Sequence, residues 1–205
     1  MMRVVVLDYG SGNLRSAQRA LERAGADTVV TANLDAAAQA DGLVVPGVGA
    51  YAACMAGLTE LGGGPVIANR VAEARPVLGI CVGMQIMFER GDEHGVRTDG
   101  LGLLPGAVTQ LPTRRLPHMG WNTVTAPVGA GIGEGERCYF VHSYAASDVA
   151  ALTAAGAQVA TARHEDAVFV AAARLGALTV TQFHPEKSAD AGAALLRAWV
   201  GGLGR

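Results

Sequence analysis

One cysteine lies between two glycines at the end of an apolar run, a spacing that is typical of a nucleophile. Residues 77–85 read Val-Leu-Gly-Ile-Cys-Val-Gly-Met-Gln, with Cys81 at the centre. Gly79 and Gly83 permit a tight strand-to-helix turn, the thiol counterpart of the G-x-S-x-G motif, that holds a nucleophile above the edge of a sheet. Residues 84–90 have helix-forming composition, so we expect the thiol at a helix N-terminus, where thiolate is favoured. A buried structural cysteine in a glycine-rich turn is the alternative.

A histidine and a glutamate towards the C-terminus supply the groups that a thiol nucleophile needs. Pro185 favours an extended backbone at His184, and residues two apart in an extended segment project to the same side, so His184 and Glu186 are expected to interact. A carboxylate beside imidazole fixes its tautomer and stabilises the imidazolium. With Cys81, these residues form a nucleophile, a base and an orienting acid. The alternative is a surface His-Pro turn, and other histidines compete: His94, His118, His142 and His164. His142 lies in a strand-like run, which favours a packed structural role.

A second glycine-rich turn is suited to an oxyanion hole. Pro46, Gly47, Val48 and Gly49 directly follow a predicted strand over residues 43–45. The glycines allow a backbone amide of Val48 or Gly49 to turn outward, beside the amide of Val82 that follows the nucleophile. Which of the two amides donates stays open, and an ordinary strand-to-helix turn has the same composition. Because a valine between two glycines can reverse its peptide at low steric cost, we expect the hole to be unformed in the isolated chain.

Length and composition indicate one folded α/β domain. Of the 205 residues, 50% are hydrophobic and 17% charged, which excludes disorder. No apolar run reaches the roughly 18 residues that span a bilayer, and the N-terminus lacks a secretory-signal pattern, so we expect a soluble cytoplasmic protein. A net charge of −2 gives no electrostatic reason to bind nucleic acid. Cys54, Cys81 and Cys138 are widely spaced, which disfavours a disulfide framework and a zinc site.

Hydrophobic periodicity predicts a parallel α/β first half and a β-rich, mostly antiparallel second half. The predicted strands of the first half are 3–7, 28–31, 43–45 and a run from residue 77, with helices over 14–24, 35–40, 51–58 and 64–74. Those of the second half are 108–111, 122–126, 138–144, 158–162, 168–173 and 178–183, followed by a helix over 190–200. Residues 91–106 read as polar and glycine-rich, and residues 114–122 as a loop. The Gly10/Gly12 turn lacks the third glycine of a dinucleotide-binding loop.

Together these motifs resemble those of the class I, or triad, glutamine amidotransferases. The resemblance rests on Gly-Ile-Cys-Val-Gly-Met-Gln at 79–85, Pro-Gly-Val-Gly at 46–49 and His-Pro-Glu at 184–186. Further stretches, at 8–13, 117–122, 139–144 and 182–188, are similar to the narrower family of glutaminase subunits of imidazole glycerol phosphate synthases. The resemblance spans almost the whole chain, although residues 163–166 and 171–177 follow no pattern that we can assign. It implies one amidotransferase domain over 1–205, an α/β fold with a mixed, largely parallel sheet flanked by helices.

The resemblance also implies a reaction and its residues. Cys81 attacks the carboxamide of glutamine, His184 passes the proton to the departing ammonia, and Glu186 orients His184. The oxyanion is implied to bind at Val48, Gly49 and Val82, the amino-acid end of glutamine at Gln85, Ser143 and Tyr144, and a partner subunit with its ammonia gate near Met119, Trp121, Tyr139 and Lys187. No metal or organic cofactor is required for this half-reaction.

The implied partner is a (β/α)8-barrel cyclase subunit in a heterodimer. It receives the ammonia and forms imidazole glycerol phosphate and an aminoimidazole carboxamide ribotide in histidine biosynthesis, with no nucleic acid or membrane involved. One alternative is the glutaminase of anthranilate or pyridoxal phosphate synthesis, against which the Pro-His-Met-Gly-Trp-Asn segment argues. The other is a non-catalytic relative in which Cys81 senses oxidants, against which the complete Cys/His/Glu set argues. A Ser/His/Asp hydrolase is excluded because no serine lies at the turn.

Overall fold

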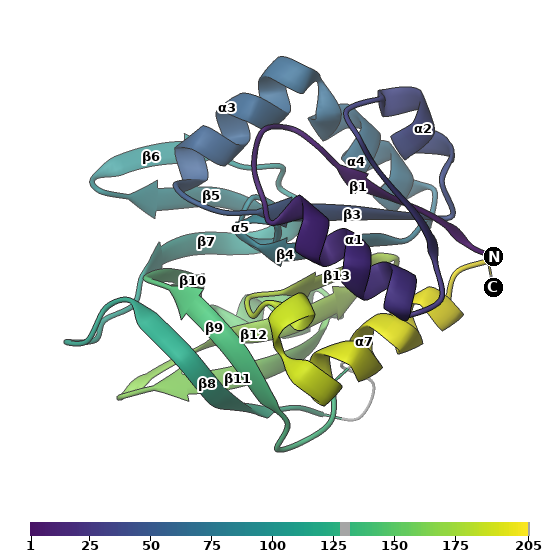
Figure 1. The fold of residues 1–205 in the computed structure, drawn as a ribbon. Helices are drawn as coiled ribbons and strands as arrows, with labels where there is room; N and C mark the ends of the chain where they lie inside the picture. Colours follow the sequence, from purple (N-terminus) through teal and green to yellow (C-terminus); the bar gives the residue numbers. More distant parts are fainter. Residues whose placement is uncertain (128–131, 205) are drawn as a thin grey trace.

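A mixed sheet flanked by helices runs through the computed structural model, which describes residues 1–127 and 132–204. Within these residues a nine-stranded sheet has the order β2-β1-β3-β4-β13-β12-β11-β8-β9, and a four-stranded sheet has the order β10-β7-β5-β6. Figure 1 shows the larger sheet between helices, with the two chain ends side by side. The predicted fold class, α/β with a β-rich second half, is confirmed.

The first half is the predicted succession of parallel strands and helices. It comprises β1 (Arg3–Leu7), α1 (Leu14–Arg23), β2 (Asp27–Thr31), α2 (Leu34–Gln39), β3 (Gly42–Gly47), α3 (Tyr51–Leu61), α4 (Gly63–Ala72) and β4 (Val77–Cys81). All pairings among these strands are parallel. Every residue of β3 and β4 is buried, which explains why they read as continuous apolar runs rather than as alternating ones.

The helix predicted over residues 84–90 is wrong. The helix α5 (Val82–Gln85) has one turn, and the chain then enters β5 (Phe88–Glu93), which pairs antiparallel with β6 (Val96–Asp99) and parallel with β7 (Leu104–Gln110). Ile86, Met87 and Phe88 are all buried, so the segment has no polar face on which a longer amphipathic helix depends. Residues 91–106, read as polar and glycine-rich, thus contribute to all three of these strands.

The second half is mostly antiparallel, as predicted, but β7 pairs in parallel with β5, and β13 in parallel with β4. After β7 it comprises β8 (His118–Thr125), β9 (Arg137–His142), β10 (Tyr144–Ala146), α6 (Val149–Ala154), β11 (Gln158–His164), β12 (Ala167–Leu175), β13 (Leu178–Thr181), the 3₁₀ helix η1 (Pro185–Lys187) and α7 (Ala189–Gly201). The loop predicted over 114–122 is wrong from His118 onwards. At the start of β8 the polar His118 and Asn122 point inward and the apolar Met119 and Trp121 point outward, opposite to an ordinary half-buried strand, whereas residues 123–125 follow the ordinary pattern.

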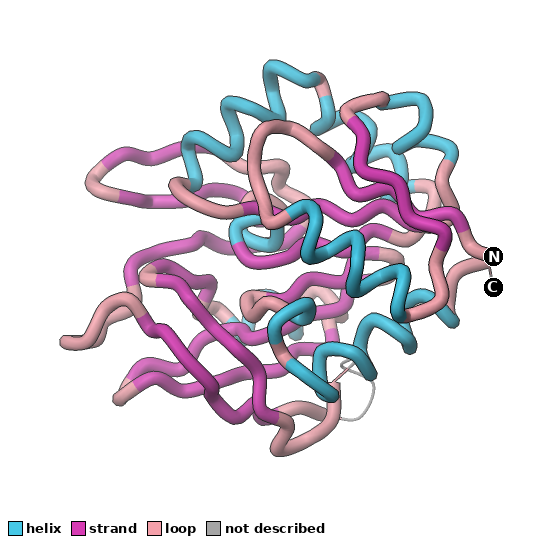
Figure 2. Tube along the Cα trace, in the orientation of Figure 1, coloured by secondary structure: helices cyan, strands magenta, loops and turns pink. Residues whose placement is uncertain are grey.

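Strand β13 brings the end of the chain back to the first half. It pairs in parallel with β4, so the residues after β13 leave the sheet beside the carboxyl end of β4. Helices α1 and α7 pack together over one face, and α2, α3 and α4 over the other (Figure 2). Ligands of open α/β sheets bind outside the carboxyl ends of parallel strands. No helix of the described ranges is long and apolar enough to cross a membrane.

Candidate active site

Cys81 ends β4 in a backbone conformation that side-chain-bearing residues rarely adopt. Its φ is 56° and its ψ −115°. A Cβ added to Gly83 would collide with the Val45 carbonyl oxygen, and one on Gly79 would lie 2.8 Å from the Gly83 oxygen. The two glycines therefore let α5 pack directly against β3 and β4. This packing holds Cys81 in its strained turn at the carboxyl edge of the sheet, as the spacing predicted.

The imidazole of His184 is buried against the carboxylate of Glu186. His184 Nδ1 lies 2.8 Å from Glu186 Oε1, and the two side chains are 3% and 2% exposed. His184 is extended, as Pro185 requires, but Glu186 lies in η1, so the pair meets through a turn and not through strand alternation. Burial alone would lower the pKa of His184, but a hydrogen bond with Cys81 and the contact with Glu186 raise that pKa to about 9. The ring is therefore an imidazolium at neutral pH.

The backbone of His184 is held from both sides. Its N–H donates to the Tyr139 oxygen over 3.0 Å, and the Ser188 hydroxyl donates to its carbonyl over 2.6 Å. Ser188 itself is fully buried and also accepts from the Tyr139 N–H over 3.0 Å. These bonds fasten the segment after β13 to the edge strand β9, so the imidazole keeps its place beside Cys81.

Cys81 and His184 open into one pocket of about 380 Å³. Six other residues singled out from the sequence line it with them: Val48, Gly49, Val82, Gln85, Ser143 and Tyr144. Glu186 lies behind His184 and does not line the pocket. Sequence reasoning gave no role at the pocket to five lining residues: Glu93, His94, Gln110, Val141 and His142, the last of which was expected to be a packed structural residue. Glu93 and His94 come from β5 and its turn, in the stretch over 91–106 that was read as polar and glycine-rich, and Gln110 comes from β7.

Two glutamine side chains link the pocket wall to Cys81. The Gln85 amide donates to the Tyr144 carbonyl over 2.9 Å and to Gln182 Oε1 over 3.0 Å. Gln182 is fully buried, and its Nε2 lies 3.9 Å from Cys81 Sγ. The sequence analysis gave Gln182 no role of its own. The available signal was a polar residue in an otherwise apolar strand end, two positions before His184.

Comparison with known proteins places this arrangement in a family. The sequence model of the family described as "Glutamine amidotransferase class-I" matches residues 5–200. The imidazole glycerol phosphate synthase subunit HisH of Mycobacterium tuberculosis is 60% identical over 204 residues, covering 98% of both chains. The chain belongs to the HisH family. The HisH of Streptomyces avermitilis is 56% identical over 208 residues, covering 98% of this chain and 97% of the relative.

The fold of this HisH-family chain is shared with more distant amidotransferases. A crystal structure titled as a glutamine amidotransferase superposes with a TM-score of 0.76 at 22% identity, covering 97% of each chain. At that identity the likeness concerns the fold alone.

In this HisH-family chain the amide of Val48 is bonded to the N-terminal turn. The Val48 N–H donates to Ser11 Oγ over 3.0 Å, and the Ser11 hydroxyl donates to the Val48 carbonyl over 2.9 Å. The Cys54 thiol lies 3.3 Å from the same carbonyl oxygen, and the Tyr9 hydroxyl donates to the Pro46 carbonyl over 2.7 Å. The turn that was considered as a dinucleotide loop therefore contacts the predicted oxyanion segment, a role the sequence analysis missed.

The residues implied to meet a partner lie on or next to the outer face of β8 and β9. Met119 is 66% exposed and Trp121 47% exposed. Trp121 faces Tyr139 across the two strands, with ring centroids 6.0 Å apart. Lys187 is exposed in η1, which packs beside β9. All four are thus close to the segment that carries His184.

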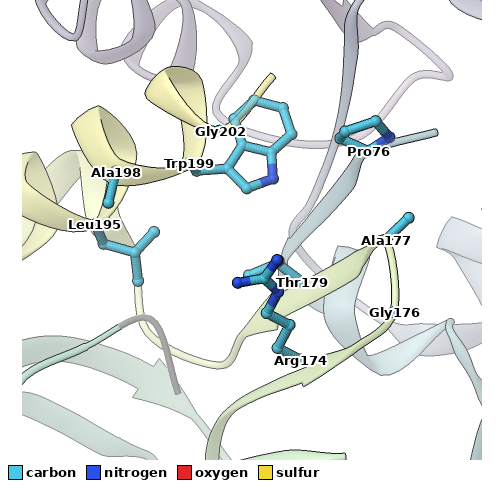
Figure 3. A pocket seen from close by; sticks show the side chains of 9 residues that line it. All are labelled: Pro76, Arg174, Gly176, Ala177, Thr179, Leu195, Ala198, Trp199 and Gly202. Carbon is cyan, nitrogen blue, oxygen red and sulfur yellow. The ribbon is translucent and has the colours of Figure 1, made fainter. Parts of the chain in front are cut away.

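A second hollow of about 140 Å³ lies at the opposite end of β4 from Cys81. Pro76, which precedes β4, forms one wall, and the side chains of Trp199 and Arg174 turn towards it from α7 and β12 (Figure 3). The described residues that line it include no cysteine, histidine or acid. A five-residue strand spans about 16 Å, so this hollow is remote from Cys81.

Proposed function

We propose that this chain, as one domain over residues 1–205, is the glutaminase subunit of imidazole glycerol phosphate synthase. It hydrolyses glutamine to glutamate and ammonia through a thioester at Cys81. The observation that carries the proposal is that Cys81, about half the chain away from His184 and Glu186, is linked with them in one set at a single pocket. The high identity to HisH relatives over nearly the full length supports the choice of this amidotransferase over that of another pathway.

The first half-reaction uses Cys81 and His184 as an ion pair. The Cys81 thiolate attacks the carboxamide carbon, and the C–S bond forms as electrons move onto the carbonyl oxygen. His184, an imidazolium at neutral pH, then gives its proton to the amide nitrogen, and ammonia leaves as the carbonyl reforms. Glu186 stabilises the imidazolium before transfer and keeps Nδ1 protonated afterwards, so that Nε2 serves the reacting atoms.

The second half-reaction releases glutamate. Neutral His184 takes a proton from water, the resulting hydroxide attacks the thioester carbon, and the C–S bond breaks to return the Cys81 thiolate. The new γ-carboxyl group releases its proton to solvent, which gives glutamate and the starting ion pair, so the cycle consumes one glutamine and one water. Gln85, Ser143 and Tyr144 hold the amino-acid end of glutamine, a role that the family resemblance implies and that their place in the pocket lining supports.

The oxyanion is held by the amide of Val82 together with one from the segment of Val48 and Gly49. In the isolated chain the Val48 amide is bonded to Ser11, which supports a latent enzyme whose oxyanion hole forms only in the loaded complex. Loss of one oxyanion donor costs about 2.7–4 kcal/mol of transition-state stabilisation, which is enough to suppress wasteful hydrolysis.

The partner is a (β/α)8-barrel cyclase subunit that docks on the face carrying Met119, Trp121, Tyr139 and Lys187. An exposed tryptophan and methionine on one strand face support this choice, since aromatic residues and methionine are enriched at interfaces. The ammonia passes to the cyclase, which forms imidazole glycerol phosphate and an aminoimidazole carboxamide ribotide in histidine biosynthesis. We place the heterodimer in the cytoplasm.

The test is ammonia release from glutamine, measured with and without the cyclase and its nucleotide ligand. Cys81→Ala is expected to lose nearly all activity under every condition. Cys138→Ala is the matched control, because Cys138 is buried and its burial raises the pKa of that thiol to about 12, which keeps it unreactive. Acivicin, which a structurally similar glutaminase domain binds, should modify Cys81 in the wild type. Failure of acivicin to react would favour the non-catalytic alternative, and undiminished release by Cys81→Ala would refute the mechanism.

A further inference from the structure

Two buried histidines outside the catalytic set face each other across strands β8 and β9. His118 and His142 are opposite one another in the register, and are 5% and 7% exposed. His118 Nδ1 lies 3.0 Å from His142 Nε2. His142 also lines the active-site pocket, whereas His118 does not. The pair therefore reaches from the interior of β8 to the wall of the glutamine site.

The hydrogen atoms of this pair have one consistent arrangement. His142 Nδ1 lies 3.0 Å from the Tyr144 carbonyl oxygen, which can only accept, so Nδ1 carries the hydrogen and Nε2 of the neutral ring accepts. His118 Nδ1 must then donate to His142. Burial lowers the pKa of His118 to about 4 and that of His142 to about 3, so both rings are neutral at physiological pH.

Asn122 fixes the other end of the chain of hydrogen bonds. Its Oδ1 accepts from the Thr123 N–H over 2.8 Å, and its Nδ2 donates to the Arg163 carbonyl over 2.8 Å. The amide orientation is therefore determined, and the second Nδ2 hydrogen points to His118 Nε2 over 3.1 Å. Every polar atom of the two imidazoles is satisfied, with donation running from Asn122 through His118 and His142 to Tyr144.

The last bond of this series closes the corner at which the chain changes sheets. His142 is the final residue of β9 in the larger sheet, and Tyr144 is the first residue of β10 in the smaller one. The Tyr144 carbonyl accepts from His142 and also from Gln85, whose amide is in turn linked through Gln182 to the neighbourhood of Cys81. One carbonyl thus joins the corner, the pocket wall and the nucleophile.

We propose that His118 and His142 are positioning residues for glutamine, which hold the Ser143–Tyr144 corner and Gln85 at the spacing that the amino-acid end of the substrate requires. The inference rests on the proposed glutaminase function and deepens it. Neither histidine belongs to the Cys81, His184 and Glu186 set, so the pair acts on substrate binding and leaves the chemical steps unchanged.

The strand that carries His118 also carries the proposed docking face. His118 and Asn122 point inward from β8, while Met119 and Trp121 between them are exposed on its outer side. A partner seated on that outer face fixes β8, and with it the donor that sets the orientation of His142. The glutamine site is therefore expected to be best ordered in the complex.

The experiment compares two substitutions of His142 in the complex with the cyclase. His142→Asn retains a donor near the position of Nδ1, whereas His142→Leu removes it. We expect KM for glutamine to rise about tenfold in His142→Leu, the effect of one lost hydrogen bond and a loosened corner, with kcat within about twofold. His142→Asn should stay within about threefold of the wild-type KM. His118→Leu should raise KM in the same direction by a smaller factor, because His142 keeps its bond to Tyr144.

The readouts separate positioning from misfolding and from failure of the proposed function. Acivicin labelling of Cys81 counts the active molecules, so a partly unfolded variant lowers the active fraction without raising KM. If wild type hydrolyses glutamine and both leucine variants keep its KM, the positioning role is refuted while the glutaminase stands. An equal fall of kcat in His142→Leu and His142→Asn also refutes it. If wild type neither hydrolyses glutamine nor reacts with acivicin, both proposals fall.

Discussion

The Ser11 hydroxyl is bonded to both the N–H and the carbonyl of Val48, over 3.0 and 2.9 Å. Val48 lies on the segment expected to complete the oxyanion hole, and an oxyanion donor must point at the pocket where the negative charge develops. Ser11 therefore stabilises an orientation in which the Val48 amide serves the N-terminal turn. Removing this contact should favour the orientation that catalysis needs.

We predict that Ser11→Ala raises the glutaminase activity of the isolated chain by about fivefold, the equivalent of one hydrogen bond of about 1 kcal/mol. Activity of the loaded complex should change little, because there the Val48 amide has already left Ser11. Initial rates of ammonia release with and without the cyclase measure both. Ser147→Ala, at an exposed site away from the pocket, is the control. If the isolated Ser11→Ala chain is as slow as the wild type, the bond between Ser11 and Val48 does not hold the isolated chain in a low-activity state.

The pH dependence of kcat/KM should report the ionisation of His184. Its pKa is raised to about 9, so the imidazolium that protonates the departing amide nitrogen is present at neutral pH and is lost as the pH rises through about 9. We expect an alkaline limb there in the pH profile of the complex. The same raised pKa stabilises the folded protein below about pH 6.5, and this contribution is lost as the pH rises through the folded value.

Glu186→Gln tests the contribution of Glu186, beside that of the hydrogen bond with Cys81, to the raised pKa of His184. The amide cannot supply the charge that favours the imidazolium, so the alkaline limb should move to lower pH, and kcat at neutral pH should fall by about a hundredfold or more. A pH profile of the variant, beside that of the wild type, measures both effects. A limb that stays in place would mean that Glu186 does not raise the pKa of His184.

Trp121→Ala should weaken binding of the cyclase without harming the catalytic residues. Its ring is 47% exposed on the proposed docking face, and truncation of a tryptophan at the centre of an interface costs about 2 kcal/mol or more, a Kd increase of about thirtyfold. Titration calorimetry gives the Kd for the cyclase, and acivicin labelling shows whether Cys81 is still reactive. Val96→Ala, 58% exposed on β6, is the control and should leave Kd unchanged. Unaltered affinity in Trp121→Ala would place the partner on another face.

Arg70→Met should destabilise the first half of the fold. The Arg70 side chain is 2% exposed and its guanidinium donates to five backbone carbonyls, those of Ala37, Ala38, Ala40, Asp41 and Pro76. Methionine fills similar space but leaves these carbonyls without that donor, so the free energy of unfolding should fall by about 3 kcal/mol. Urea denaturation measures this loss. Arg75→Met removes a single contact, with Ala40, and should lose about 1 kcal/mol. Equal losses of unfolding free energy in Arg70→Met and Arg75→Met would contradict the larger structural role of Arg70.

Local spacing was sufficient to predict the turn that carries Cys81 and the strands that lead into the pocket. Cys81 between two glycines, His184 before a proline and the apolar runs of β3 and β4 each depend on residues within a few positions of one another. Backbone sterics and strand burial act over that range, so the pattern predicts them. Family resemblance supplied the roles of Gln85, Ser143 and Tyr144, which the structure places together at the pocket.

Where local preferences conflict with packing, the sequence prediction was wrong. The segment after Cys81 has helical composition but becomes β5, because its apolar residues are buried on all sides. Similarly, His118 and Asn122 resemble loop residues, yet they lie on the inner side of β8, where partners from β9 and β11 satisfy their hydrogen bonds. The local composition around His118 and Asn122 does not indicate which residues lie opposite them in the sheet.

The amino-acid sequence by itself determined the strained turn at Cys81, the contact of His184 with Glu186 and the division into a parallel and an antiparallel half. Only the tertiary structure decided that β13 lies beside β4, that Ser11 bonds to Val48, and that His118 and His142 pair next to the pocket. The physical reason is that turns and strand burial arise from neighbours along the chain, whereas these contacts depend on the order of strands in the sheet.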